Sequence, residues 1–296
     1  MIRDDADLTG FRINILLPPS WHIGNNLNTA IGFVGAFGTQ NAGVSCGGGS
    51  FGSSSLRTEL FNGTTWSNGN NMTTSRSFQG AFGLQNAGVV SGNSVGFGTA
   101  VSTETFNGTT WTALGAPGNM NVARSENASF GIQSAGITCG GFNGAYPVST
   151  ETFNGAIWSL SGNMNGQHNL AAAFGTQSAG AIAGSELGFP NTTNTAELFN
   201  GVTWSNTGNL IQNTGSAAGF GIQSNGFICG GSGQILGTPI YNTTEKFNGS
   251  AWSLTSNLNV ARYGLGAFGT STNAVSCNGY TAANYAGPSA TTELWF

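Results

Sequence analysis

The sequence predicts an all-β fold, and three observations support this prediction. Apolar and polar residues alternate with a period of two in short pieces, which is typical of β-strands. Near-copies of one segment, Thr-Glu-x-Phe-Asn-Gly-x-x-Trp, recur at 58–66, 103–111, 150–158, 196–204 and 244–252. The 49 glycines fall between these pieces, and no stretch shows helical periodicity. A chain built from such copies is a repeat protein, so its fold follows from one unit.

Each repeat unit predicts four strands. The Asn-Gly pair between two short strand-like pieces favours a two-residue type I′ hairpin turn, which makes the recurring segment strands c and d. Upstream, strand a ends at Ala-Phe-Gly within the pattern Phe-Gly-x-Gln-x-x-Gly, and strand b ends at a Gly pair or its remnant. The repeat tryptophans are spaced by 45 to 48 residues and lie at positions 21, 66, 111, 158, 204 and 252.

This unit has the size of one β-propeller blade, and its six copies predict a six-bladed ring. The last copy, 291–296, is a strand c without a following d, and Trp21 opens a strand d without its own a and b. We expect these two ends to pair, which completes the sixth blade and leaves no unpaired sheet edge. Residues 21–296 are therefore predicted as the propeller, and residues 1–20 as an N-terminal arm for docking, with Asp4, Asp5, Asp7 and Phe11 as its candidate contact residues.

The repeat carries a family resemblance. A Gly pair, an acidic residue and an aromatic on the next strand, a Trp six or seven residues later, and Asn-Met followed by Arg resemble the kelch repeat over residues 21–296. Phe-Gly-x-Gln-[Asn/Ser]-Ala-Gly combined with the recurring segment resembles repeat proteins of marine tailed phages, notably cyanophages, which are virion-associated. The resemblance implies a six-bladed kelch-like β-propeller that contacts other virion proteins of the capsid or tail. The chain departs from ordinary kelch proteins in having very few charges.

The composition argues against several classes of partner. Charged residues make up 6% of the chain, the net charge is −4 and Lys246 is the single lysine, so we expect no nucleic-acid binding. No apolar run approaches the roughly 20 residues that span a bilayer, and the acidic start of the chain is unlike a Sec-type signal peptide. We therefore expect no membrane insertion. The resemblance to phage proteins implies a location in the virion after synthesis in the host cytoplasm, with an extracellular location as the alternative.

Residues shared by the repeats are expected to serve the repeat. The repeat glutamates are predicted to hold loops or to pair with Arg76, Arg124 and Arg262, and a partly exposed pair of this kind contributes about 1 kcal/mol or less. The four cysteines occupy one slot before the Gly pair of different blades, so they are predicted to be free buried thiols. His22 and His168 lie at unrelated repeat positions, so we expect no catalytic residue, no metal and no cofactor. The repeat glutamates are Glu59, Glu104, Glu151, Glu197, Glu245 and Glu293.

The two faces of the predicted disc differ. The a–b and c–d turns share one face and are nearly constant, whereas the b–c and d–a connections share the other face and vary in length and sequence. Function in a rigid scaffold tends to reside in such variable loops, although the rings there could also simply cover their own blade. The candidate binding residues on this face are Phe51, Phe97, Phe142, Tyr146, Phe189, Tyr241, Tyr280 and Tyr285.

These observations predict a non-enzymatic binding or structural protein. The main expectation is a phage virion component, such as a capsid decoration, tail or host-attachment propeller, which could also contact a host surface glycan or receptor. The alternative is a secreted or cell-surface propeller that binds glycans like a lectin. A propeller enzyme, such as a lyase or oxidase, is the remote alternative.

Overall fold

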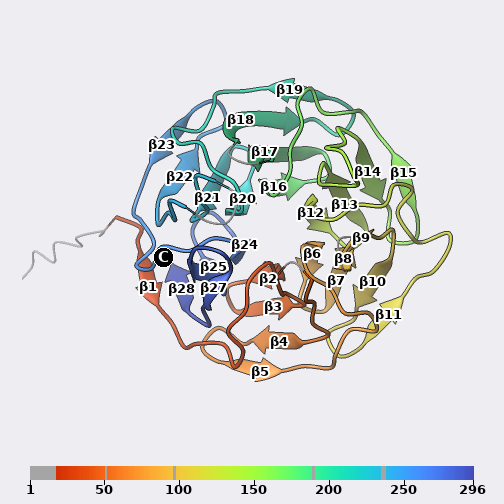
Figure 1. Cartoon of the computed structure of the whole chain (residues 1–296), viewed down its shortest axis with the longest axis horizontal. Helices are drawn as coiled ribbons and strands as arrows, with labels where there is room; N and C mark the ends of the chain where they lie inside the picture. Colours follow the sequence, from red (N-terminus) through yellow and green to blue (C-terminus); the bar gives the residue numbers. More distant parts are fainter. Residues whose placement is uncertain (1–17, 51, 96–97, 189–190, 235–237) are drawn as a thin grey trace, which may run out of the picture.

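The computed structural model describes residues 18–50, 52–95, 98–188, 191–234 and 238–296, and all regular elements in these ranges are strands. Six four-stranded antiparallel sheets surround a central axis (Figure 1). The predicted all-β, six-bladed propeller is confirmed. Among the described residues there is no helix with the length and apolar character needed to cross a bilayer.

Each blade runs from an inner strand a to an outer strand d. Blade 1 contains β2 (Gly35–Thr39), β3 (Ala42–Cys46), β4 (Thr58–Phe61) and β5 (Trp66–Asn68). Blade 2 contains β6 (Gly80–Leu84), β7 (Ala87–Ser91), β10 (Thr103–Phe106) and β11 (Trp111–Ala113). Blade 3 contains β12 (Ala128–Ile132), β13 (Ala135–Cys139), β14 (Thr150–Phe153) and β15 (Trp158–Leu160). Blade 4 contains β16 (Ala172–Thr176), β17 (Ala179–Glu186), β18 (Thr192–Phe199) and β19 (Trp204–Asn206). Blade 5 contains β20 (Ala218–Ile222), β21 (Asn225–Cys229), β22 (Thr244–Phe247) and β23 (Trp252–Leu254).

The sixth blade takes its strands from both ends of the chain. It contains β24 (Gly266–Gly269), β25 (Ala274–Cys277), β28 (Thr292–Trp295) and, as its outer strand, β1 (Trp21–Ile23). Antiparallel β1 and β28 pair in a register that places Trp21 opposite Trp295. The predicted closure of the ring by terminal strands is therefore confirmed.

Two small hairpins add to the b–c segments. β8 (Ser94–Val95) pairs with β9 (Gly98–Thr99) in blade 2, and β26 (Tyr280–Ala282) pairs with β27 (Ala286–Pro288) in blade 6. The b–c segments and d–a connections lie on one side of the disc, which we call the variable face. The opposite side, with the a–b and c–d turns, is the constant face.

The predicted type I′ turn is wrong. Phe61 pairs with Trp66, so the turn holds four residues rather than two, and in it only Gly63 has a positive φ. The Asn62 side chain replaces the missing ladder bonds, because its Oδ1 accepts the N–H groups of Thr64 (3.0 Å) and Thr65 (2.8 Å). Asn therefore acts here through its side-chain oxygen rather than through a left-handed backbone.

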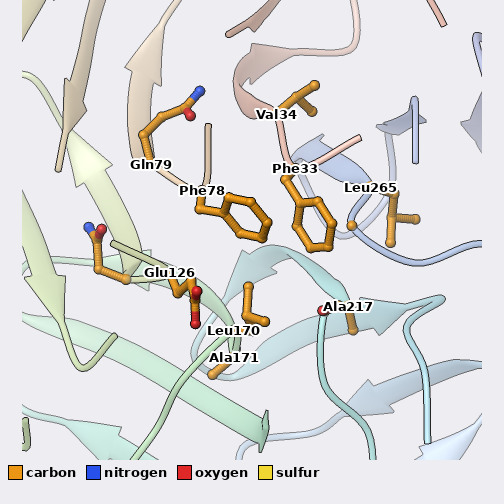
Figure 2. A pocket seen from close by; sticks show the side chains of 12 residues that line it. Phe33, Val34, Phe78, Gln79, Glu126, Leu170, Ala171, Ala217 and Leu265 are labelled. Carbon is orange, nitrogen blue, oxygen red and sulfur yellow. The ribbon is translucent and has the colours of Figure 1, made fainter. Parts of the chain in front are cut away.

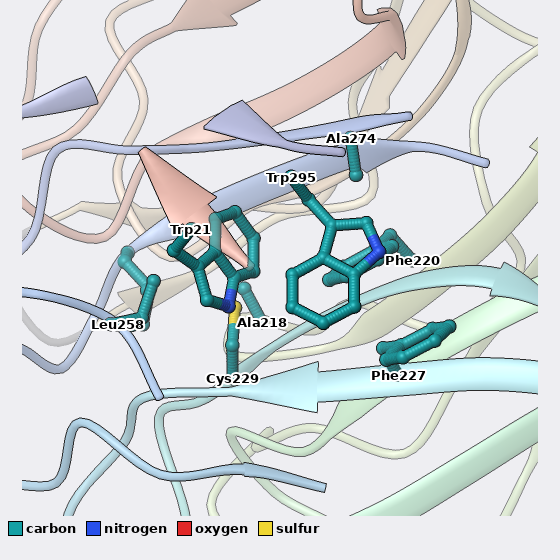
Figure 3. Close-up of a cluster of buried hydrophobic side chains, with 9 residues drawn as sticks. Trp21, Ala218, Phe220, Phe227, Cys229, Leu258, Ala274 and Trp295 are labelled. Atoms are coloured by element: carbon teal, nitrogen blue, oxygen red, sulfur yellow. The ribbon is translucent and has the colours of Figure 1, made fainter. Parts of the chain in front are cut away.

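The apolar core lies between the blades. In each blade the Phe of strand a packs over strand b of the next blade. At five of the six interfaces a glycine lets the ring approach the backbone, and a Cβ on Gly88 would collide with the ring of Phe37; in blade 6 Ala274 takes the glycine position. The same Phe meets the repeat Trp of the next blade edge to face, as Phe37 and Trp111 do at 6.4 Å. Figure 3 shows the interface between blades 5 and 6, where Trp21 and Trp295 pack against Phe220 and Phe227.

A hydrogen bond across five of the six interfaces supplements this packing. The indole N–H of the repeat Trp donates to the Thr that begins strand c of the preceding blade, as from Trp111 to Thr58 at 2.9 Å. Five of the six interfaces have this bond. At the sixth interface Ala196 stands in the Thr position, and the buried Nε1 of Trp252 has no hydrogen-bond partner.

The repeat glutamates are structural, as predicted. Each carboxylate accepts two successive backbone N–H groups from the connection that enters its own blade, as Glu104 does from Thr73 and Thr74. The pairs of N–H donors are Asn28 and Thr29 for Glu59, Asn121 and Val122 for Glu151, Asn165 and Gly166 for Glu197, Ile211 and Gln212 for Glu245, and Asn259 and Val260 for Glu293.

The predicted arginine partners of these glutamates are also confirmed. Arg76, Arg124 and Arg262 contact Glu104, Glu151 and Glu293 at 3.0 to 3.1 Å. The expected energy is wrong, however, because both groups are buried rather than partly exposed, and removing one member of a buried pair typically costs about 3–5 kcal/mol. Arg57 forms the ion pair with Glu59. In blade 4, His168 lies beside Glu197 at the position that an arginine occupies in blades 2, 3 and 6.

Candidate functional site

Six residues, one from each blade, form a ring around the axis at the variable face. Each lies two residues before its inner strand begins, and each has a left-handed backbone with φ between 48° and 60°. We call them the hub ring: Phe33, Phe78, Glu126, Leu170, Ser216 and Gly264.

Backbone hydrogen bonds close the hub ring into a circle. The N–H of each hub residue donates to the carbonyl oxygen of the hub residue in the preceding blade, at 2.7 to 3.2 Å. The circle closes between blades 1 and 6, where Phe33 N–H donates to Gly264 at 2.7 Å. The six blades thus share one backbone geometry at this point.

The side chains of the hub ring differ from blade to blade. A left-handed backbone costs a residue other than glycine about 1–2 kcal/mol, yet five of the six hub positions carry a side chain. The ring therefore displays apolar, acidic and hydroxyl groups at positions where the backbone favours glycine. A uniform scaffold with individual side chains is the geometry of a recognition site.

The hub ring surrounds an open cavity of about 90 Å³, which we call the axial cup. The rings of Phe33 and Phe78 are stacked, with centroids 4.0 Å apart, and Leu170 and Glu126 lie across from them (Figure 2). The cup is lined by Phe33, Val34, Phe78, Gln79, Glu126, Asn127, Leu170, Ala171, Ser216, Ala217, Gly264 and Leu265. Beyond it, two cavities of about 120 Å³ each follow the inner strands and are lined mainly by Gly, Ala and Ser.

Two buried carboxyl groups belong to this region. Glu126 Oε2 accepts a hydrogen bond of 2.7 Å from Asn169 Nδ2, which also donates to the backbone oxygen of Glu186. Glu186, the last residue of β17, accepts through Oε1 from the hydroxyls of Ser216 (2.8 Å) and Ser232 (3.2 Å). A polar network thus connects three neighbouring blades behind the cup.

Burial dominates the electrostatics of both carboxyl groups. It raises the pKa of Glu126, and the hydrogen bond from Asn169 offsets part of that rise. Burial also raises the pKa of Glu186 to about 7 against the lowering effect of the two serine hydroxyls, and the charge of Glu126 raises it further. Both groups therefore favour the neutral form more than an ordinary glutamate does.

Tyrosines surround the two carboxyl groups. Burial raises the pKa values of Tyr146, Tyr263 and Tyr285, and the charge on Glu186 adds to each rise. Tyr263 and Tyr280 are buried beside Phe33 and Phe78, and Tyr285 packs on the Phe33 ring at 5.7 Å. Two of the predicted binding residues, Tyr146 and Tyr285, therefore lie near the two carboxyl groups.

Two other predicted rings have structural positions. Tyr280 is 4% exposed and donates its hydroxyl to the backbone of Gly49 in blade 1, which is a core role. Tyr241 is half-buried and lies against Gly233 in its own blade. Both fit the alternative that these rings cover their own region of the fold.

The remaining predicted ring pair is displayed on blade 3. Phe142 and Tyr146 are half-buried and have centroids 5.7 Å apart, and the Tyr146 hydroxyl lies near Gly188 of blade 4. Blade 4 carries a rim cavity of about 280 Å³ lined largely by amides and hydroxyls, which include those of Asn165, Gln167 and Thr193.

Several predicted residues lie outside the described part of the chain. These are Phe51, Phe97 and Phe189 on the variable face, and Asp4, Asp5, Asp7 and Phe11 of the arm.

The hub ring was missed by the sequence reasoning, although a signal existed. The repeat is regular at the Asn-Leu/Met pair upstream and at the strand-a Phe downstream, but the hub position and the residues directly before and after it vary, and the hub itself holds Phe, Phe, Glu, Leu, Ser and Gly in the six blades. A position that varies in chemistry inside a fixed framework indicates a residue whose side chain is free to differ. Its left-handed backbone was hidden, because five of the six residues are not glycine.

None of the four cysteines lines the axial cup. All four cysteines are free and buried, as predicted, and burial raises the pKa of each thiol to about 12. Within the described ranges, no three His, Cys, Asp or Glu side chains gather in a way that could hold a metal ion. The chemistry available at the axial cup is therefore acidic, aromatic and hydrogen-bonding.

Comparison with known proteins adds no family assignment. No protein-family model matches the chain, and a search of the curated proteins returns no match. The architecture that can be stated for the chain is thus the six-bladed β-propeller, a fold compatible with binding or structural roles.

Proposed function

We propose that this propeller acts by binding rather than by catalysis, and that it does so through the variable face as a component of a tailed-phage virion. The observation that carries the binding proposal is the hub ring, in which one backbone geometry displays five different residue types around an open cup. The kelch-like character of the repeat and its resemblance to virion-associated repeat proteins support the virion assignment. Capsid or tail proteins are then its partners.

Purified particles provide the direct test of the virion assignment. Mass spectrometry of intact, nuclease-treated particles should detect peptides of this chain in a constant ratio to the major capsid protein. Absence of those peptides from intact particles would refute the assignment. The face is tested separately by incorporation of variants: Tyr146→Ala on the variable face should weaken association, whereas Ile132→Ala, exposed at an a–b turn on the constant face, should not.

A glycan is the second candidate ligand, and one observation favours it. The Phe142 and Tyr146 rings form a pair on blade 3, and the Tyr146 hydroxyl lies near Gly188 of blade 4. The preceding residue, Leu187, lines the cavity of about 280 Å³, whose lining offers amides and hydroxyls together with Glu197. Aromatic faces beside neutral hydrogen-bonding groups suit a sugar, which has both apolar faces and hydroxyls. Binding on a glycan array that persists after replacement of both rings by alanine would contradict this candidate.

A further inference from the structure

The chain contains ten Asn-Gly pairs, a dipeptide that can react within itself. The glycine nitrogen, after losing its proton, attacks the side-chain carbonyl carbon of the asparagine. The new C–N bond replaces the bond to the side-chain amide nitrogen, which takes up a proton and leaves as ammonia, and water then opens the cyclic imide to aspartate or isoaspartate. Glycine permits this attack because no Cβ shields its nitrogen or restricts its backbone. The asparagines of these pairs are Asn62, Asn68, Asn107, Asn143, Asn154, Asn165, Asn200, Asn225, Asn248 and Asn278.

Five of these asparagines lie in the c–d turns, where two hydrogen bonds hold each side chain. Asn107 Oδ1 accepts the N–H groups of Thr109 (2.9 Å) and Thr110 (2.7 Å), as Asn62 does in blade 1. Both bonds must break before the carbonyl carbon can turn towards the glycine nitrogen, so we expect the fold to slow the reaction here by about 10- to 100-fold. The other turn asparagines with this pair of bonds are Asn154, Asn200 and Asn248.

Four further pairs are protected at the glycine. In three of them the glycine N–H already donates to an acceptor, and the nitrogen must give up this bond before it can attack. The fourth pair lies inside β21, where Gly226 is paired with strands on both sides and cannot rotate towards Asn225. The three donors and their acceptors are Gly69 N–H to the Thr58 oxygen (2.8 Å), Gly166 N–H to Glu197 Oε1 (2.7 Å) and Gly279 N–H to the Ile31 oxygen (2.9 Å).

Asn143 in the b–c loop of blade 3 has neither form of protection. Asn143 and Gly144 are exposed, and Asn143 Oδ1 accepts a single long bond of 3.3 Å from the N–H of Ala145. Within the described residues the Gly144 N–H has no hydrogen bond, and a Cβ built on Gly144 would meet no atom within 4 Å. The backbone N–H of Asn143 donates to the Ala145 oxygen at 3.1 Å, which leaves the side chain free to turn. The two reacting groups can therefore meet.

We propose that Asn143 is a site of spontaneous deamidation in the folded protein, and that the fold suppresses the reaction at the other nine Asn-Gly pairs. The product carries a carboxylate at a sequence position between Phe142 and Tyr146, whose ring centroids are 5.7 Å apart. The isoaspartate form also adds a methylene to the backbone of this loop. The modification thus changes the charge and the shape of the variable face, and it requires neither an enzyme nor the proposed virion partners.

Incubation of the folded full chain at pH 8 tests the proposal. Samples taken over time are unfolded and digested with a glutamate-specific protease at mildly acidic pH, where the reaction is slow. Cleavage after Glu126 and Glu151 releases peptide 127–151, in which Asn143-Gly144 is the one Asn-Gly pair, and cleavage after Glu104 releases peptide 105–126, in which Asn107-Gly108 is the one pair. Mass spectrometry then follows the gain of one mass unit, and we expect peptide 127–151 to convert at least about tenfold faster than peptide 105–126.

Two controls separate the effect of the fold from that of the sequence. In a chain unfolded by urea the two peptides should convert at similar rates, because the hydrogen bonds at Asn107 are gone. Asn143→Gln keeps an exposed amide, but its longer side chain disfavours ring closure. This variant should remove the mass gain in peptide 127–151 and leave the conversion of peptide 105–126 unchanged.

Three results would overturn the proposal. They are equal rates for the two peptides in the folded chain, an unmodified peptide 127–151 under conditions in which the unfolded chain reacts, and a mass gain in peptide 127–151 that persists in Asn143→Gln. None of these results bears on the virion assignment, which depends on the composition of purified particles.

Discussion

Substitution of Ala196 by threonine should stabilise the propeller by completing the hydrogen bond that one blade interface lacks. At the other five interfaces a Thr hydroxyl accepts the indole N–H of the repeat Trp at 2.9 to 3.0 Å. At the interface between blades 4 and 5, Trp252 Nε1 is buried without a partner. The facing residue on strand b is Ala183, where four other blades have the larger Cys, and Ala196 also lines the rim cavity, so there is room for the added atoms.

The expected magnitude follows from the cost of an unsatisfied buried donor, which is about 1–3 kcal/mol. Threonine at position 196 should recover about 1–2 kcal/mol of this cost, and the higher β-propensity of threonine acts in the same direction. The unfolding entropy of a chain of 296 residues is about 0.6 kcal/mol/K, so the midpoint of thermal unfolding should rise by about 2–3 °C.

The assay is urea denaturation, together with thermal unfolding, of the wild type, Ala196→Thr and Ala196→Val. Valine has the same shape as threonine without the hydroxyl, so it reports the effect of added volume and propensity alone. Threonine should exceed valine by about 1 kcal/mol in the free energy of unfolding. Equal stabilities of the two variants would show that the indole N–H is satisfied in another way and would refute the reasoning. The reverse change, Thr150→Ala, should leave the indole N–H of Trp204 without a hydrogen-bond acceptor, as that of Trp252 is now, and lower the free energy of unfolding by a similar amount.

Two further predictions concern the blade interfaces and the axial cup. Gly136→Ala should destabilise the fold by about 2–3 kcal/mol, because its Cβ would collide with the Phe82 ring, and an unchanged urea midpoint would contradict the packing described above. The pKa of Glu186 is raised on folding to about 7, so the folded state holds this proton more tightly than the unfolded state does, and stability is lost as the pH rises from about 5 to 8. Glu186→Gln should therefore be more stable than the wild type at pH 8 by up to about 3 kcal/mol and nearly equal to it at pH 4, and a difference that does not change with pH would refute the assignment.

The fold could be predicted from the sequence because every blade repeats the same four strands with the same framework residues. The Trp spacing, the Gly pairs and the strand-c fragment at 291–296 together specify strand count, blade count and closure. The turn type could not be predicted from Asn-Gly alone, because the Asn62 side chain competes with the backbone for the N–H groups of the turn. The burial of the ion pairs was also underestimated, since their depth depends on how neighbouring blades cover them.

The candidate site could be predicted only in part. The variable face was inferred correctly from strand order, because the direction of each strand decides which connections share a side. The axial cup was not inferred, because Phe33 and Glu126 are nearly 100 residues apart and resemble each other in nothing but their place before strand a. Their common left-handed backbone and their shared circle of hydrogen bonds arise only when the ring closes.

The pairing of β1 with β28 also has a consequence for biosynthesis. Trp21 leaves the ribosome long before Trp295, its partner in the antiparallel pair. The sixth blade therefore stays incomplete until β28 has been synthesised. Until translation nears its end, the first blade lacks the neighbour whose Phe268 and Thr292 cover Trp66. Blades 2 to 5 can assemble as they emerge, whereas the two ends of the row meet only once the final strand is released.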